Sequence, residues 1–140
     1  MNVVYKYQST IPYSLHDMFV SKIEIIDNNI KFYFENGYIE LKEPYKQVDG
    51  NIIIEDFDLD FSYVYFLSEN GQYGDFKGKK MEFLDFIKNY NSFYFEVLDE
   101  MYGYNQVNYS GYLSLPDKEN LIDICISIYY KGNIIYELKD

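Results

Sequence analysis

The chain has 140 residues, 48% of them hydrophobic, and a formal net charge of −11. This size and composition predict one globular domain, 1–140, and the acidic balance argues against nucleic acid or an anionic membrane surface as a partner. With one histidine, one cysteine and no arginine, the usual catalytic, zinc-binding and phosphate-clamping side chains are nearly missing, so we expect no metal and no cofactor.

The first half of the chain alternates between apolar and polar residues with a period of two, which is typical of half-buried strands. Residues 22–26 and 30–35 flank Asp27-Asn28-Asn29 and predict a hairpin. The alternation changes phase at Gly37, which predicts a bulge or a turn into a new strand. We predict further strands at 51–55 and at 61–67. In the second strand almost no polar residues alternate with the apolar ones, so we expect both of its faces to be covered.

The second half contains the clearest helical spacing, in Phe83, Phe86, Ile87 and Tyr90, which predicts a helix at about 79–90. Strands are expected at 93–97 and at 107–115, where Pro116 ends the pattern. The strongest alternation, at 122–128, is followed by a Lys-Gly-Asn turn and a last strand at 134–138, and predicts a second hairpin.

Together these elements predict a mainly β protein. We expect an antiparallel meander that forms a partly open barrel or a two-sheet sandwich, with one helix. Exposed strand edges are compatible with a monomer or a homodimer.

Residues 55–60 form an acidic segment. If it is extended, Asp56, Asp58 and Asp60 share one face and could bridge a hard cation such as calcium. An EF-hand calcium loop that begins at Asp56 would need glycine and glutamate where Phe61 and Leu67 stand. The favoured interpretation is an amphipathic edge strand, with residues 57, 59 and 61 packed inward and the carboxylates in solvent.

The single histidine lies in the pair His16-Asp17. A histidine beside a carboxylate is a candidate for acid–base chemistry, because its pKa lies near neutrality. A His-Asp phosphohydrolase would need several more histidines to hold its metals, so we favour a turn capped by Asp17 with His16 at a strand end.

One basic cluster, Lys77, Gly78, Lys79 and Lys80, lies at the predicted start of the helix. Helix N-termini attract anions, which makes the cluster a candidate anion site. The spacing of Gly74 and Gly78 and the lysine after Lys79 do not fit a P-loop. The alternative is that the lysines bind nothing. A lysine in the first turn of a helix opposes the helix dipole, but this costs only about 0.3 to 1 kcal/mol and can be tolerated.

Tyrosine, with 18 residues, is the most distinctive component of the chain. Most of the rings must fill the core, but Tyr102, Tyr104, Tyr109 and Tyr112 surround two glycines and could line a groove for a sugar or nucleotide-like ligand. Tyrosines on the polar phase of the strands, such as Tyr33, Tyr94 and Tyr129, should be partly exposed, and exposed rings are enriched at protein interfaces.

The leading functional hypothesis is a non-enzymatic acidic binding module for a basic protein, for instance an immunity-type neutraliser of a toxin. Asp56, Asp58 and Asp60 would steer the partner by charge, and Tyr33 and Tyr94 would anchor it. The alternative is the small-molecule binder with the tyrosine-lined groove. A hydrolase that uses paired carboxylates of 56–60 or 96–100 is the least favoured class.

The composition, with Leu15-His16-Asp17 and the ring-rich run 93–104, resembles small tyrosine-rich cytoplasmic proteins of low-GC Gram-positive bacteria such as clostridia, a group without an assigned activity. The resemblance implies a cytoplasmic location and transfers no functional residue. The single Cys125, the absence of a leader-like N-terminus and the lack of an apolar stretch of roughly 18 residues favour the same location.

Overall fold

A computed structural model describes residues 1–8, 10–68 and 78–139, and most of it is antiparallel β-sheet. The strands are β1 (Asn2–Tyr5), β2 (Tyr13–Ser14), β3 (Phe19–Ile26), β4 (Asn29–Phe34), β5 (Tyr38–Glu40), β6 (Gln47–Val48), β7 (Gly50–Ile54), β8 (Tyr63–Ser68), β9 (Lys79–Glu82), β10 (Tyr94–Gly103), β11 (Gln106–Ser114), β12 (Ile122–Tyr129) and β13 (Ile134–Leu138). A 3₁₀ helix, η1 (Leu59–Phe61), and an α-helix, α1 (Phe83–Asn89), complete the described elements.

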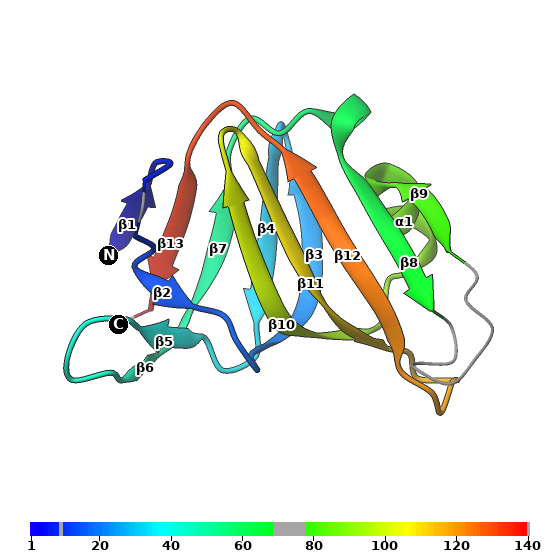
Figure 1. Cartoon of the computed structure of the whole chain (residues 1–140), viewed down its shortest axis with the longest axis horizontal. Coiled ribbons are helices and arrows are strands. Elements are labelled where there is room, and N and C mark those ends of the chain that lie inside the picture. The colour runs from blue at the N-terminus through cyan, green and yellow to red at the C-terminus, as the bar shows by residue number, and fades with distance from the viewer. Residues whose placement is uncertain (9, 69–77, 140) are drawn as a thin grey trace.

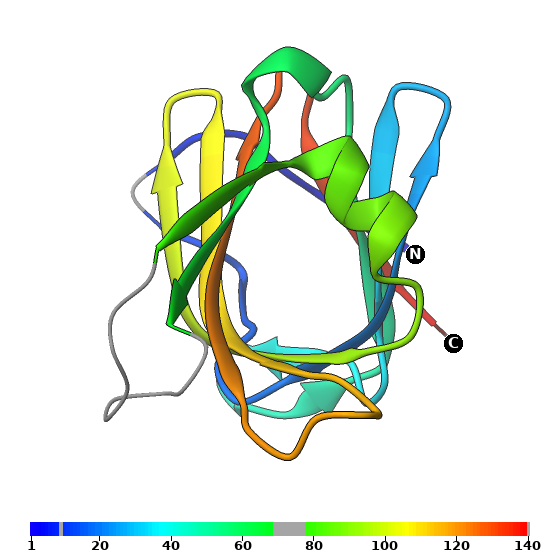
Figure 2. The same cartoon turned by 90° about the vertical axis from the view of Figure 1, so that its right-hand side faces the viewer.

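Ten strands form one sheet in the order β1-β13-β7-β4-β3-β10-β11-β12-β8-β9, and β2, β5 and β6 form a small second sheet near its lower edge (Figure 1). The large sheet curls around the core without closing into a barrel (Figure 2). Its two halves are joined where Phe95 lies opposite Val20 and Glu96 opposite Phe19. Helix α1 follows β9 and lines a groove together with β3.

The core lies between the two halves of the curled sheet and follows from the alternation of the strands. Strand β11, for example, alternates buried and partly exposed residues along its length, because successive side chains point to opposite faces. Phe32 of β4 meets Tyr109 of β11 across the core, with ring centroids 5.5 Å apart. Helix α1 contributes Phe83 and Phe86, both fully buried. Each such ring stabilises the fold by about 1.5 to 3 kcal/mol.

The predicted fold class is confirmed: the protein is mainly β and antiparallel, with one α-helix in the part of the chain that the structure describes. Strands β3 and β4 form the hairpin predicted around Asp27-Asn28. The phase change at Gly37 marks a turn into the new strand β5, and Gly37 takes a left-handed φ of 70° there. The helix begins at Phe83, later than predicted, because Lys79–Glu82 pair with β8 as strand β9.

The second predicted hairpin is wrong. Both strands exist, but β12 pairs with β11 and β8, whereas β13 pairs with β1 and β7 on the other half of the sheet. The connection crosses the upper end of the molecule, where the amide of Lys131 donates to the carbonyl of Asp56 and that of Gly132 to the carbonyl of Glu55. These bonds hold the connection against the end of β7 instead of closing a tight turn.

Strand β8 was expected to be covered on both faces, and this is also wrong. Val64 and Phe66 are buried, but Leu67 is exposed and Tyr63 and Tyr65 are only partly covered. The two tyrosines lie on the outer face, where the ammonium group of Lys80 lies 3.8 Å from the centroid of the Tyr63 ring. Aromatic composition alone therefore overstated the burial of this strand.

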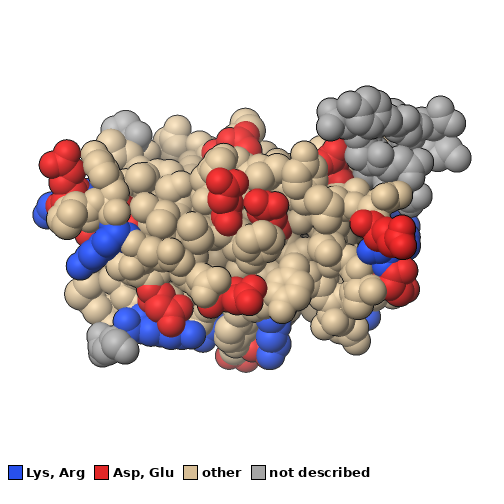
Figure 3. All heavy atoms as spheres, turned by 90° about the horizontal axis from the view of Figure 1, so that it is seen from below, with Lys and Arg blue, Asp and Glu red and all other residues tan. Residues whose placement is uncertain are grey.

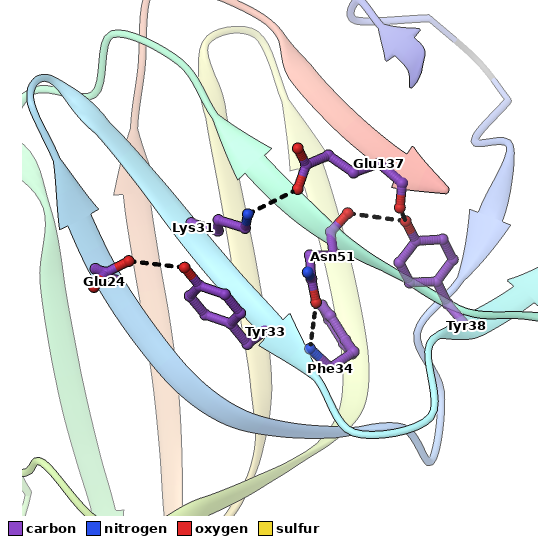
Figure 4. A network of polar contacts seen from close by, with 7 residues as sticks. All are labelled: Glu24, Lys31, Tyr33, Phe34, Tyr38, Asn51 and Glu137. Atoms are coloured by element: carbon purple, nitrogen blue, oxygen red, sulfur yellow. Dashed lines mark hydrogen bonds and ion pairs between the residues drawn. The ribbon is translucent and has the colours of Figure 1, made fainter. Parts of the chain in front are cut away.

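Tyr38 ties the small sheet to the large one (Figure 4). Its hydroxyl lies 2.9 Å from the carbonyl oxygens of Asn51 on β7 and Glu137 on β13. Beside it, the Asn51 side chain accepts a hydrogen bond from the buried amide of Phe34, at 3.1 Å. An ion pair between Lys31 and Glu137, with a nitrogen–oxygen distance of 3.1 Å, joins β4 to β13. Burial raises the pKa of Tyr38 far above its ordinary value, so the phenol stays a donor.

Candidate functional site

The upper end of the molecule carries η1, the β10–β11 turn and the connection between β12 and β13 (Figure 1). The acidic segment does not form the predicted edge strand. Asp56 takes a left-handed φ of 52°, which ends the extended conformation after β7. The Asp58 side chain then accepts a hydrogen bond from the amide of Asp60 and caps η1.

This turn reverses the expected exposure of the apolar residues. Leu59 and Phe61, predicted to pack inward, are 40% and 63% exposed, and only Phe57 packs inward, against Phe83. The Phe61 ring lies 6.3 Å from the ring of Tyr129 at the end of β12. We call this surface the acidic lip: Asp56, Asp58 and Asp60 of this turn, together with the exposed Leu59, Phe61 and Tyr129.

A groove with a volume of about 360 Å³ lies on the other side of the β12–β13 connection. We call it the tyrosine groove, because Tyr5, Tyr7, Tyr104 and Tyr130 line it, together with Lys6, Asn105, Gly132 and Asn133. Tyr5 and Tyr130 are buried, whereas Tyr7 and Tyr104 stand in solvent with their rings 6.3 Å apart and nearly perpendicular. Burial, and the neighbouring Tyr5, raise the pKa of Tyr130 to about 12, so its hydroxyl remains protonated at neutral pH.

A polar cluster lies in the core next to Tyr5, whose ring is 5.4 Å from that of Tyr102. Its centre is Glu100, which faces the core because a β-bulge shifts the register of β10 between Val97 and Asp99. The carboxylate accepts hydrogen bonds from the amide of Leu15, at 2.9 Å, and from the hydroxyl of Tyr102, at 2.6 Å. Burial raises the pKa of Glu100 despite these two bonds.

Two further tyrosines complete this cluster. The hydroxyls of Tyr109 and Tyr136 are buried, and neither finds a hydrogen-bond partner among the described residues. Burial raises the pKa of both phenols, which remain neutral. Unsatisfied hydroxyls cost free energy in a core, so these two phenols reduce the stability of the folded state.

Glu100 makes stability depend on pH in a predictable direction. Because its pKa is raised above the ordinary 4.5 in the folded protein, the folded state keeps the proton to higher pH than the unfolded state. Its contribution to stability is complete below pH 4.5 and is lost as the pH rises through the raised value. Glu100→Gln, which mimics the protonated form and still accepts from Leu15, should therefore be more stable than the wild type at neutral pH.

The measurement is the free energy of unfolding in urea as a function of pH. We expect the two proteins to differ little near pH 4, and Glu100→Gln to gain at pH 8 about 1.4 kcal/mol for each pH unit by which the pKa is raised. Glu119→Gln, on the exposed loop between β11 and β12, is the control and should follow the wild type. If the stability of the wild type and of Glu100→Gln changed with pH in the same way, the raised pKa of Glu100 would be contradicted.

The four tyrosines predicted to line one groove are not brought together. Tyr104 lies in the tyrosine groove, and Tyr102 and Tyr109 lie in the core cluster. Tyr112 lies opposite Asp123 of β12, partly exposed. The sequence missed Tyr5, Tyr7 and Tyr130, because nothing in a linear pattern places the N-terminal strand beside the end of β12.

The residues predicted to bind a partner also lie apart. Tyr33, Tyr94 and Tyr129 are partly exposed, as predicted. The Tyr33 hydroxyl donates to Glu24, at 2.8 Å, and its ring has the ammonium groups of Lys22 and Lys31 about 5 Å from its centroid. Tyr94 begins β10 at the opposite end of that strand from the β10–β11 turn. Of these predicted residues, the three aspartates and Tyr129 belong to the acidic lip, whereas Tyr33 and Tyr94 lie elsewhere.

The proposed anion site loses its structural basis. Lys79 and Lys80 lie in β9, and Gly78 precedes it, so none of them lies in the first turn of α1, which holds Asp85 instead. Lys77 lies outside the described residues. His16 and Asp17 form an exposed turn in which their side chains lie 3.2 Å apart, and Asp17 has a left-handed φ of 65°.

On the lower face of the molecule, the charged residues that the structure describes do not form a patch of one sign. Carboxylates and lysines are interspersed there and separated by uncharged surface (Figure 3). Within the described residues, no group of three histidine, cysteine, aspartate or glutamate side chains could hold a metal ion. The same part of the chain contains no helix long and apolar enough to cross a membrane.

The chain matches no protein-family model, and comparisons with curated proteins and with solved structures found no significant match.

Proposed function

We propose that this protein is a non-enzymatic binding module whose acidic lip docks a basic protein. The observation that carries the proposal is the exposure of Leu59 and Phe61, which stand in solvent among Asp56, Asp58 and Asp60. Exposed apolar side chains beside several like charges are typical of an interface in which the charges steer the partner and the apolar side chains anchor it. The formal net charge of −11 adds a long-range attraction for a basic partner.

The location proposed for this interaction is the cytoplasm. The single cysteine, Cys125, is free and only partly buried on β12, which suits a reducing compartment. A basic toxin neutralised by this chain would be one form of such an interaction.

The test begins with a pull-down at low salt, in which the captured basic protein is eluted with a salt gradient. The variant Asp56→Asn, Asp58→Asn and Asp60→Asn removes the charge of the lip and keeps its geometry, because asparagine can still cap η1 and tolerates the left-handed φ at position 56. We expect elution at lower salt and roughly tenfold slower association.

A matched triple variant separates the site from the total charge. Glu35→Gln, Asp117→Asn and Glu119→Gln change the net charge by the same three units at exposed positions outside the lip. This control should bind like the wild type, whereas Phe61→Ala should dissociate roughly tenfold faster because an anchor is lost. Equal losses in both triple variants would show that only overall charge matters and would contradict the lip as the binding site.

A further inference from the structure

We propose that the tyrosine groove is a separate binding site for a neutral carbohydrate, with one pyranose ring stacked on Tyr104. This site lies across the β12–β13 connection from the acidic lip and does not depend on the protein partner. Its volume of about 360 Å³ falls within the range of small-molecule sites.

The rings give the first argument. Tyr104 is 77% exposed at the tip of the β10–β11 turn, where it stabilises little of the core, and its ring makes an edge contact with the exposed ring of Tyr7. An exposed aromatic face is a suitable platform for the C–H face of a sugar. The interplanar angle of 85° between the two rings leaves no parallel pair here to sandwich a flat nucleobase.

The polar groups give the second argument. Tyrosine hydroxyls and the side-chain amides of Asn105 and Asn133 can each both donate and accept hydrogen bonds. Sugar hydroxyls have the same double capacity, so the hydroxyls of Tyr7 and Tyr104 and the two amides can pair with them in either direction. The Tyr5 hydroxyl is already bonded to the backbone of Gln8, and Lys6 can only donate. Asn105 is held in the left-handed conformation, with a φ of 58°, and its carbonyl accepts from the amide of Tyr130, which fixes the wall of the groove.

Charge selects a neutral ligand. Among the described residues that line the groove, Lys6 alone is charged, and it stands on a protein whose formal net charge is −11. The overall field repels an anion such as a nucleotide, and Lys6 repels a cation. Among the described residues, the carboxylate of the adjoining core cluster is Glu100, which already accepts hydrogen bonds from Leu15 and Tyr102, so we assign binding and not hydrolysis to the groove.

Saturation-transfer difference NMR with the intact protein tests the site. The probes are glucose, galactose, mannose, N-acetylglucosamine, cellobiose and maltose at about 10 mM, which saturates a site with a Kd near 1 mM. We expect transfer to the C–H protons of at least one sugar, at a level that salt does not change. Adenosine and glucuronic acid represent the competing ligand classes, a nucleoside and an anionic sugar. Saturation transfer to either of them without transfer to any neutral sugar would overturn the proposal.

Tyr104→Ala should weaken the sugar that binds by roughly 5- to 10-fold. Tyr45→Ala, which removes another exposed ring from outside the groove, is the matched control and should bind as the wild type does. The proposal also fails if no neutral sugar shows transfer, or if Tyr104→Ala binds as tightly as the wild type. Salt-independent sugar binding would stand even if the acidic lip bound no protein.

Discussion

Gly111→Ala should destabilise the protein by about 3 to 5 kcal/mol, because the added methyl group overlaps backbone atoms of the neighbouring strand. A Cβ at this position would lie 1.8 Å from the carbonyl oxygen of Glu96 and 3.1 Å from the amide nitrogen of Leu98. Both atoms belong to the backbone of β10, so no side chain can rotate away to relieve the overlap. The two strands would have to separate where β10 is bulged.

The same substitution should disturb the interior cluster, because the bulge beside Gly111 is what turns Glu100 toward the core. Urea unfolding, followed by circular dichroism, measures the loss. Gly103→Ala is the matched control at the end of β10, where the nearest atoms to an added Cβ are 3.9 Å away, and it should change stability by less than about 0.5 kcal/mol. Equal midpoints for Gly111→Ala and the wild type would show that β10 and β11 are not this closely paired.

The local elements of the fold could be predicted because they depend on local patterns. The alternation at 22–35 specified β3, its turn and β4, and the spacing of Phe83, Phe86 and Ile87 identified α1. Alternation shows which face of a strand is buried, but it carries no information about which strand lies next to it. For that reason β12 and β13 were both found and wrongly paired with each other.

The candidate sites were harder to predict because they depend on backbone conformation and on distant contacts. The sequence pattern predicts an extended strand at Asp56, but the left-handed φ of 52° at this residue leaves Leu59 and Phe61 exposed and not buried. The tyrosine groove combines the N-terminal segment with the β10–β11 turn and the β12–β13 connection, which only the strand order brings together. Of the four tyrosines that the sequence places around Gly103 and Gly111, only Tyr104 lines this groove.

Tyr38→Ala should cost about 3 to 5 kcal/mol, because a fully buried ring is lost at the contact between the two sheets. The ring centroid of Tyr38 lies 5.0 Å from that of Tyr13 and 5.6 Å from those of Phe34 and Tyr136. Gly50 leaves room for the hydroxyl, since a Cβ there would lie 2.6 Å from it. The site is thus shaped for a tyrosine, and a smaller side chain leaves a cavity.

Tyr38→Phe isolates the hydroxyl and should cost about 1 to 2 kcal/mol, because the carbonyls of Asn51 and Glu137 lose a donor while the ring packing remains. Urea unfolding gives both values, and Tyr45→Ala, an exposed ring between β5 and β6, should stay within about 0.5 kcal/mol of the wild type. Hydrogen exchange then separates local from global loss: if Tyr38 docks the small sheet, the amides of β2, β5 and β6 should lose protection before those of β7. Uniform loss across both sheets would instead mean that the small sheet unfolds only together with the core.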